Sequence, residues 1–319
     1  MTLRVLVTND DGVAAPGLAR LAGAAVRRGL EVVVAAPLTE AAGTSAALTA
    51  VEREGHVVVR DHPLPELPGV PVYGVGGSPG LVTLIALHGA FGPPPAVVLS
   101  GVNRGANVGR AVLHSGTVGA ALTAAANGCR AMAVSLDVPP ASVVTAGEGG
   151  LIGSPTGSGS PAGHTAGSGG PAGHTVGDDE PVGSAVGDDG PAGPAGIRVP
   201  EAEWHWSTAA RVALDLLPRL TAGPVQSVLN VNAPNLPYER LRGVRRATLA
   251  DFGQVHLTVT EVGHGYVRTS LVEPGPAVQP GSDLFWLAEG YASATAIRAV
   301  TEATDIDLSG LSGEDWRPT

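Results

Sequence analysis

The chain has little cysteine, few aromatic residues and no long apolar run. Among its 319 residues Cys129 is the single cysteine, so no internal disulfide can form, as is typical of a cytoplasmic protein. Polar residues from Thr8 onward leave no room for a signal peptide. Apolar stretches such as residues 32–38 are far shorter than the roughly 18 to 20 residues that span a bilayer. We therefore expect a cytoplasmic protein without a membrane span.

Positive charge is also scarce. The formal net charge is −10, and no cluster of basic residues is present, which excludes binding to a nucleic-acid duplex through its phosphates. Apolar residues make up 44% of the chain but aromatic residues only 3%, so a core must consist mainly of Ala, Val and Leu. Such a core is typical of a parallel sheet covered by helices, and it indicates an α/β protein.

The alternation of elements in the first part supports this class. Residues 4–9 form a β-branched run, Pro16 opens an apolar-periodic stretch that predicts a helix to Val26, and residues 31–36 form a second strand. This βαβ unit predicts a doubly wound, mostly parallel, Rossmann-like sheet. Further strands are expected at 57–59, 70–75, 96–100 and 131–136, and helices at 78–91 and 117–127.

The composition changes abruptly after the first part of the core, residues 1–137. Residues 138–200 are rich in Gly, Pro, Ser, Ala and Asp, and the pentapeptide at 161–165 repeats at 171–175. Because this segment offers little large apolar surface to offset ordering entropy, we expect a disordered insertion. Residues 201–319 are then expected to complete the core and to form a C-terminal extension.

The pattern of that last part is mixed. Residues 204–217 predict an amphipathic helix that ends at Pro218, and residues 227–232 predict a buried strand. Three later runs tend to alternate between apolar and polar residues and predict an antiparallel extension that serves oligomerisation: residues 244–249, 255–260 and 266–271.

Two adjacent carboxylates follow the first strand. Ligands of open α/β sheets bind beyond the carboxyl ends of the strands, where Asn9, Asp10 and Asp11 lie. Carboxylates there favour a hard-oxygen site for Mg²⁺ or Mn²⁺. The alternative is that an aspartate simply caps the following helix.

Two further segments offer groups for a cation or an anion. The loop at residues 100–109 contains glycines that permit positive φ, and its Asn103 and Asn107 present both oxygens and amides, although loops of this composition are usually only solvated. Residues 115–117 open an Ala-rich helix with free backbone N–H groups and two hydroxyls, which suits a phosphate, although Ser and Thr are also ordinary helix caps.

These segments together resemble one family, the SurE survival-protein nucleotidases. The resemblance rests on Thr8-Asn9-Asp10-Asp11-Gly12, on Ser100 to Gly109, on Ser115-Gly116-Thr117-Val118, and on residues 34–37, 229–234 and 289–295. It implies a Rossmann-like core with a C-terminal oligomerisation extension, assembled as a homodimer or homotetramer. It also implies a phosphatase that depends on a divalent metal and acts on nucleoside 5′- and 3′-monophosphates or similar small phosphate esters.

The resemblance also implies roles for individual residues. Asp10, Asp11 and Asn103 match the metal ligands, with the two aspartates as the catalytic carboxylates. The expected phosphate contacts are Asn9, Asn107, Ser115, Gly116 and Thr117.

The chain departs from the family pattern at several positions. Ala42 stands where the family has a serine ligand, and Thr44 or Ser45 could supply a substitute hydroxyl. His114 stands where tyrosine is frequent and is a candidate proton donor or packing residue. Leu38-Thr39 and Ala111 replace charged residues, so the substrate preference is more open than the reaction type.

Two other functions compete with a metal phosphatase. Ala42 and the lost charges also fit a catalytically weak paralogue that binds phosphorylated ligands or has a regulatory role. A Rossmann dehydrogenase is disfavoured because Asn9-Asp10-Asp11-Gly12 stands where Gly-x-Gly-x-x-Gly would be needed, and two carboxylates would repel a pyrophosphate.

Overall fold

The computed structural model describes residues 2–41, 43–53, 55–138, 204–251, 256–263, 266–272, 278–302 and 305. Ala42 and nearly all of the predicted insertion at 138–200 lie outside these residues. The chain on either side of residues 144–199 belongs to one compact unit. In the part of the chain that is described, no helix is long and apolar enough to cross a membrane.

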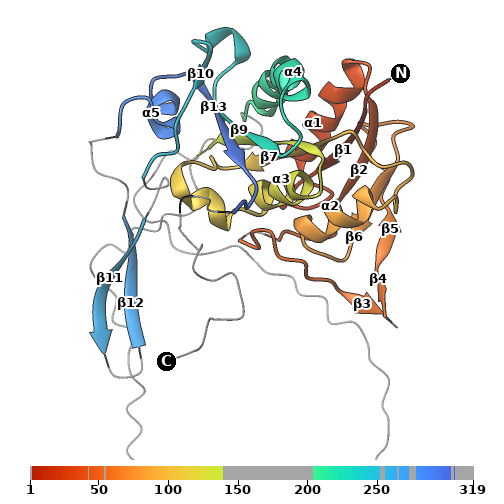
Figure 1. Cartoon of the computed structure of the whole chain (residues 1–319), viewed down its shortest axis with the longest axis horizontal. Coiled ribbons are helices and arrows are strands. Elements are labelled where there is room, and N and C mark those ends of the chain that lie inside the picture. Colours follow the sequence, from red (N-terminus) through yellow and green to blue (C-terminus); the bar gives the residue numbers. More distant parts are fainter. Residues whose placement is uncertain are drawn as a thin grey trace, which may run out of the picture. The chain divides into compact units, whose positions relative to one another are not determined.

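The core of the fold is a sheet of nine strands in the order β10-β13-β9-β8-β7-β1-β2-β6-β5 (Figure 1). The six strands from β9 to β6 run parallel, whereas β5 is antiparallel to β6 and β13 is antiparallel to β9. The predicted Rossmann-like α/β class is therefore confirmed. The strand bounds are β1 Arg4–Thr8, β2 Glu31–Pro37, β5 Val59–Asp61, β6 Val72–Val75, β7 Val97–Arg104, β8 Arg130–Asp137, β9 Ser227–Pro234, β10 Val244–Arg246 and β13 Ala292–Arg298.

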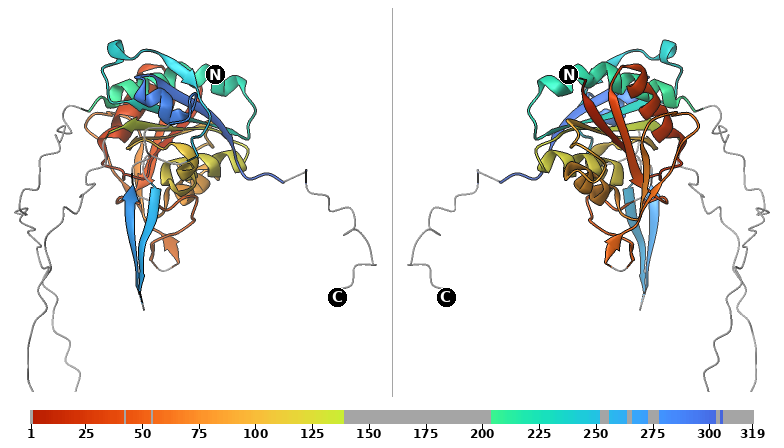
Figure 2. Two further views of the ribbon diagram at one scale, coloured as in Figure 1. Left: turned by 90° about the vertical axis from the view of Figure 1, so that its left-hand side faces the viewer. Right: turned by 90° about the vertical axis from the view of Figure 1, so that its right-hand side faces the viewer.

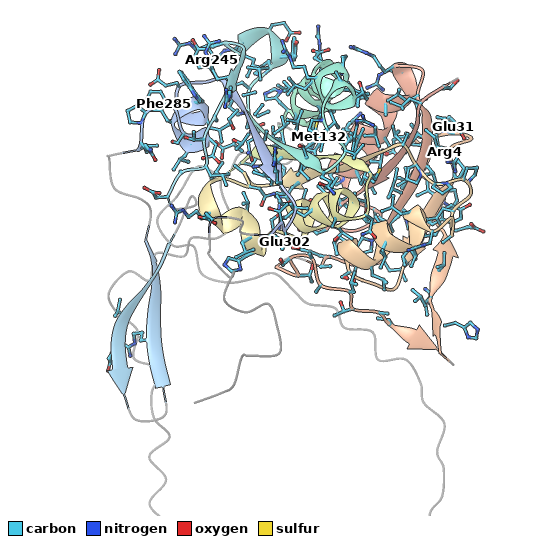
Figure 3. All side chains as sticks on the ribbon, viewed as in Figure 1. Arg4, Glu31, Met132, Arg245, Phe285 and Glu302 are labelled. Atoms are coloured by element: carbon cyan, nitrogen blue, oxygen red, sulfur yellow. The ribbon has the colours of Figure 1, made fainter. Side chains whose placement is uncertain are left out.

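Helices cover both faces of this sheet. Helices α1 and α4 pack on one face, and α2 and α3 pack on the other (Figures 1 and 2). Successive side chains of a strand point to opposite faces, so Met132 of β8 joins the α1 and α4 core while its neighbours Ala131 and Ala133 join the other (Figure 3). The helix bounds are α1 Pro16–Arg27, α2 Pro79–Leu87, α3 Gly116–Ala126, α4 Trp206–Ala222 and α5 Asp283–Ala288, with short 3-10 helices η1 Gly109–His114 and η3 Tyr238–Arg240.

The sheet face toward α2 and α3 becomes polar where the parallel strands β1, β7, β8 and β9 end and the antiparallel strand β13 begins. Parallel pairing places Thr8 beside Ser100, and on neighbouring strands Asn230 lies beside Thr295. All of the polar residues in this band are buried, and they come from five strands: Thr8, Ser100, Ser135, Asn230, Asn232, Ser293 and Thr295. Because buried polar groups need partners, this end of the sheet suits a polar loop or ligand.

Two elements differ from the sequence predictions. Helix α4 continues through Pro218 to Ala222, because Pro218 lies on the exposed face while Leu217 and Leu220 remain buried. Strand β10 does not belong to the antiparallel extension but pairs in parallel with β13 at the edge of the main sheet. The predicted antiparallel hairpin is present as β11 His256–Gly263 and β12 Tyr266–Val272. A second, short hairpin pairs β3 Glu52–Arg53 with β4 His56–Val57.

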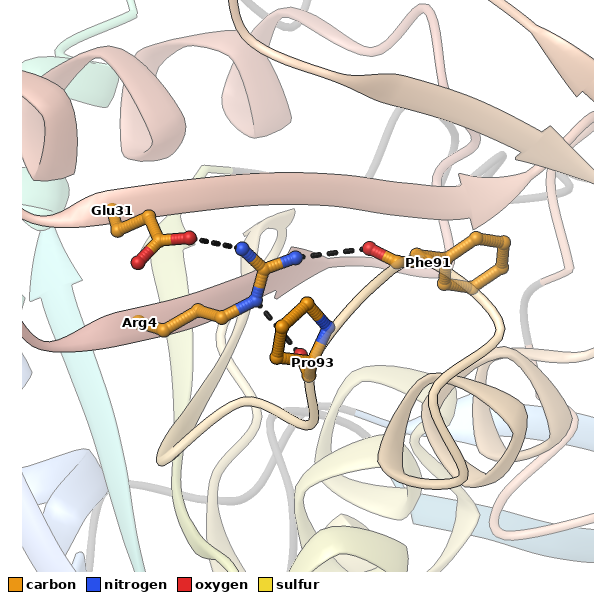
Figure 4. A network of polar contacts seen from close by, with 4 residues as sticks. All are labelled: Arg4, Glu31, Phe91 and Pro93. Carbon is orange, nitrogen blue, oxygen red and sulfur yellow. Dashed lines mark hydrogen bonds and ion pairs between the residues drawn. The ribbon is translucent and has the colours of Figure 1, made fainter.

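Arg4 fixes the start of the central strand β1. Its guanidinium donates to the carbonyl oxygens of Pro93 at 2.8 Å and Phe91 at 2.9 Å, and it pairs with the Glu31 carboxylate (Figure 4). These bonds tie the segment before β7 to strands β1 and β2. The amino ends of β1, β2 and β7 are thereby aligned. They lie at the opposite end of the strands from the polar band.

Candidate functional site

Asp10 and Asp11 lie on a tight turn directly after β1. The turn is closed by the Asn9 side chain, whose Nδ2 donates to the Gly12 carbonyl oxygen at 3.0 Å, and Gly12 has φ of +102°. Neither aspartate caps the next helix, because the N-cap of α1 is Ala15 and it receives no side-chain hydrogen bond. The capping alternative is therefore wrong, and both carboxylates remain available for another role.

Helix α3 begins against Asp10. The Thr117 hydroxyl donates to Oδ1 of Asp10, and both residues are buried. A Cβ atom at Gly116 would lie 2.7 Å from Oδ2 of Asp10, so only glycine allows this approach. Ser115 is the N-cap, and its Oγ accepts from Val118 N–H at 3.1 Å, while its hydroxyl hydrogen has no acceptor among the described residues. The predicted phosphate segment and the first carboxylate are thus in contact.

The carboxylate pair is held in an environment that disfavours its charge. Burial raises the pKa of Asp10, and the Thr117 hydrogen bond only partly opposes this. Burial, and then the neighbouring Asp10 charge, raise the pKa of Asp11 to about 7, while the Arg104 backbone N–H acts in the opposite direction. Glu40, which the sequence reasoning did not select, raises both values further through its charge.

The end of β7 meets the second carboxylate. The backbone N–H of Arg104, the last residue of β7, donates to Oδ2 of Asp11 at 3.3 Å. The pairing of β7 with β8 shifts register between Ser100 and Asn103, so the strand bends as it enters the loop. The Asn103 amide donates to the Gly105 carbonyl oxygen at 2.7 Å, and within the described residues its Oδ1 has no partner. Asn103 thus keeps a free oxygen one residue from the contact with Asp11.

Asn107 is held by side chains of β8 and β9. Its carbonyl oxygen accepts from the Asn230 amide at 2.8 Å and from the Asn232 amide at 3.0 Å, while its own N–H donates to Asn232 at 2.7 Å. Its side-chain amide donates to the Ser135 hydroxyl at 2.9 Å. The loop is therefore anchored and is not a freely solvated segment, which rules out that alternative. A phosphate contact by Asn107 stays a prediction.

Asp283 provides a second anchor. Its buried carboxylate accepts from Gly109 N–H at 2.8 Å, from Ala250 N–H at 3.0 Å and from Leu284 N–H at 2.9 Å. Sequence reasoning missed this residue, since an acidic residue in the first turn of a helix is unremarkable. Asn230 and Asn232 were also missed, although their spacing of two in a strand places both on one face and was a usable signal.

Thr44, Ser45 and His114, the candidate substitute ligands and pocket residues, lie in different places. Thr44 lies at the site, with its Oγ1 3.0 Å from the position a Cβ of Gly116 would take, and it donates to the Ala41 carbonyl oxygen at 2.9 Å. The Ser45 hydroxyl instead donates to the Leu113 carbonyl oxygen at 2.7 Å. His114 is exposed at the end of η1. Ala42 itself lies outside the described residues.

The donor set fits a hard divalent cation. It consists of two carboxylates and nearby amide and hydroxyl oxygens, the ligands that Mg²⁺ and Mn²⁺ prefer. Within the described ranges no ion pair neutralises Asp10 or Asp11, and Oδ1 of Asn9 is buried without a partner. Those ranges contain no cluster of three or more acidic, histidine or cysteine side chains able to hold a metal, so a cation here would complete its shell with neutral oxygens or water.

Comparison with known proteins agrees with this geometry. The family model "Survival protein SurE" matches residues 5–148. The 5′-nucleotidase SurE of Actinobacillus pleuropneumoniae is 30% identical over 302 residues, which cover 93% of this chain and 94% of the relative. That of Haemophilus influenzae is 28% identical over 324 residues and covers 98% and 97%. The crystal structure of a SurE protein from Aquifex aeolicus has a TM-score of 0.63 at 21% identity, covers 96% and 97%, and shows the same fold. The chain belongs to the survival protein SurE family.

Proposed function

We propose that the protein is a phosphomonoesterase that depends on a divalent metal and hydrolyses nucleoside 5′- or 3′-monophosphates or similar small phosphate esters. The observation that carries this proposal is the contact between the buried Asp10, one of two adjacent carboxylates, and a helix start that suits phosphate. Relatives named 5′-nucleotidase SurE support the nucleotide substrate.

The metal, Mg²⁺ or Mn²⁺, would be held by Asp10, Asp11 and Asn103, with the Thr44 hydroxyl beside Gly116 as a candidate further ligand. When bound, it supplies positive charge that stabilises the charge developing on the phosphoryl oxygens. Thr117 orients Asp10 by its hydrogen bond, and the Arg104 N–H orients Asp11. Both carboxylates are thereby fixed before substrate arrives.

The phosphate would lie at the start of α3. The Ser115 hydroxyl hydrogen, which has no acceptor among the described residues, and the first backbone N–H groups of the helix are available to donate to an anion, and the positive end of the helix dipole adds to the attraction. In the reaction a water oxygen bonds to phosphorus as the ester P–O bond breaks. A carboxylate of the pair accepts the water proton, and the leaving alcohol oxygen takes up a proton.

The test is phosphate release from a panel of nucleoside monophosphates and other small esters, with Mg²⁺, with Mn²⁺ and with EDTA. We expect turnover that needs metal and falls at least a hundredfold in Asp10→Asn and Asp11→Asn. The matched control is Asp215→Asn, which changes an exposed carboxylate on α4 and should keep full activity.

A second candidate function is the binding of phosphorylated ligands without turnover, which Ala42 favours because the family's serine ligand is absent. Absence of turnover with every metal and ester, together with binding of a nucleoside monophosphate, would establish this alternative and reject the phosphatase. A homodimeric or homotetrameric state and a cytoplasmic location stay predictions.

A further inference from the structure

A cavity of about 780 Å³ adjoins the carboxylate site. Thr44 connects the two, because it lines the cavity and its Oγ1 also lies beside Gly116, the residue that approaches Asp10. The volume is within the range of small-molecule pockets. The walls come from the segment after β2 and from β5 and the end of β6: Pro37, Leu38, Thr39, Ala41, Thr44, Thr49, Ala50, Val51, Val58, Val59, Arg60, Val75, Gly76, Gly77 and Ser78.

The cavity walls are held by backbone hydrogen bonds, so the cavity does not depend on a ligand to form. Val51 N–H donates to the Gly76 carbonyl oxygen at 2.7 Å, and Gly76 N–H donates to that of Val58 at 2.7 Å. Ser78 N–H donates to Thr49 at 2.9 Å. A Cβ at Gly76 would lie 3.2 Å from the Cβ of Val51, so glycine at this position lets the two walls meet closely.

The lining is apolar except for a few hydroxyls and one charged side chain. Arg60, on the edge strand β5, is the only ionisable residue among those that line the cavity. It is exposed, and no ion pair or side-chain hydrogen bond occupies its guanidinium within the described part of the chain. Its guanidinium is therefore free to make paired hydrogen bonds to a phosphate or a carboxylate.

We propose that this cavity holds the organic part of the substrate and that Arg60 binds a second anionic group on it. The favoured substrates are then phosphate monoesters that carry another phosphate or carboxylate, a class to which nucleoside 3′,5′-bisphosphates belong. The cleaved phosphate lies at α3, the organic part lies against the apolar wall beyond Thr44, and the second anion reaches β5. This inference rests on the proposed phosphatase function and names its substrate class.

The test compares adenosine 5′-monophosphate with adenosine 3′,5′-bisphosphate, which differ only in the second anion. We expect the wild type to favour the bisphosphate in kcat/KM by about tenfold, mainly through KM, because a charge-assisted pair contributes roughly 1.5 kcal/mol or more. Arg60→Gln should remove this preference and leave the monophosphate unchanged. Arg246→Gln is the matched control, since Arg246 is exposed on β10 at the opposite edge of the sheet.

Calorimetric binding of the same two nucleotides separates this inference from the proposed function. Hydrolysis without a preference for the bisphosphate, or with a preference that Arg60→Gln keeps, overturns the inference and leaves the phosphatase standing. Absence of hydrolysis combined with tighter binding of the bisphosphate that Arg60→Gln abolishes supports the cavity's role and rejects catalysis. Absence of both hydrolysis and preferential binding overturns both.

Discussion

Thr117 donates its hydroxyl hydrogen to Oδ1 of Asp10, although the two residues are 107 positions apart in the chain. The bond joins the first turn of α3 to the turn after β1, and both side chains are buried. It fixes the direction of one carboxylate at the place where the proposed metal and phosphate would meet.

Replacing Thr117 with Val keeps the shape of the side chain but removes the donor to Asp10. We expect kcat/KM to fall about tenfold and metal affinity to weaken, because an unpartnered buried carboxylate costs roughly 1 to 3 kcal/mol. Steady-state kinetics over a Mn²⁺ titration measures both. Thr123→Val on the same helix is the control, since the Thr123 hydroxyl donates only to the Gly119 carbonyl oxygen. Equal effects of the two substitutions would contradict a specific role for Thr117.

Gly116→Ala places a methyl group where no space exists. The new Cβ would lie 2.7 Å from Oδ2 and 2.9 Å from Cβ of Asp10, so the carboxylate must move. We expect at least a tenfold loss of metal-dependent activity with little change in far-UV circular dichroism. Gly23→Ala in α1 is the control, because its Cβ meets the flexible end of Arg27 at 3.3 Å, and it should stabilise the protein by about 0.5 to 1 kcal/mol. Unchanged activity in Gly116→Ala would refute the tight approach.

The stability of the metal-free protein should depend on pH through Asp11. Its pKa is about 7 in the folded chain, against about 4 when unfolded, so the folded state binds more protons between these values. The contribution of this group is therefore complete below pH 4 and is lost as pH rises through 7. In EDTA, the Tm of the wild type relative to Asp11→Asn should fall on the order of 5 °C between pH 5 and pH 8. A constant difference would show that Asp11 titrates normally, and added Mn²⁺ should reverse the fall.

Asp283→Asn should loosen the loop without touching the carboxylate pair. One oxygen that accepts from Gly109, Ala250 or Leu284 becomes an amide that cannot accept, which we expect to cost about 2 to 3 kcal/mol of stability and to raise KM. Urea unfolding and kinetics on the same samples give the two numbers. Asp251→Asn is the control and should change neither quantity, since that exposed carboxylate makes a surface ion pair with Arg110 at 3.3 Å.

The fold class and the polar residues that follow the strands could be predicted from the sequence. Buried strands and periodic helices predicted the parallel sheet, and Asp10 and Thr117 could be placed near one crevice because carboxyl ends of parallel strands share an edge. The contacts that hold the loop were not predictable in the same way. Asp283 is 174 positions from Gly109, and only the reversed strand β13 and the path of α5 bring them together. The predicted end of the helix at Pro218 was wrong for a different reason. The burial of Leu220 in the core outweighs the local tendency of proline to end a helix.

Asn230 and Asn232 hold Asn107, and Asp283 accepts from Gly109 in the same loop. These late residues determine when the loop can become ordered during synthesis. A nascent chain that has left the ribosome as far as β8 already contains both aspartates and the start of α3, yet the strand that fixes the loop has not been translated. The loop can reach its final position only when residues beyond 283 have emerged. The enzyme we propose would therefore reach its full activity only after almost its whole length has been made.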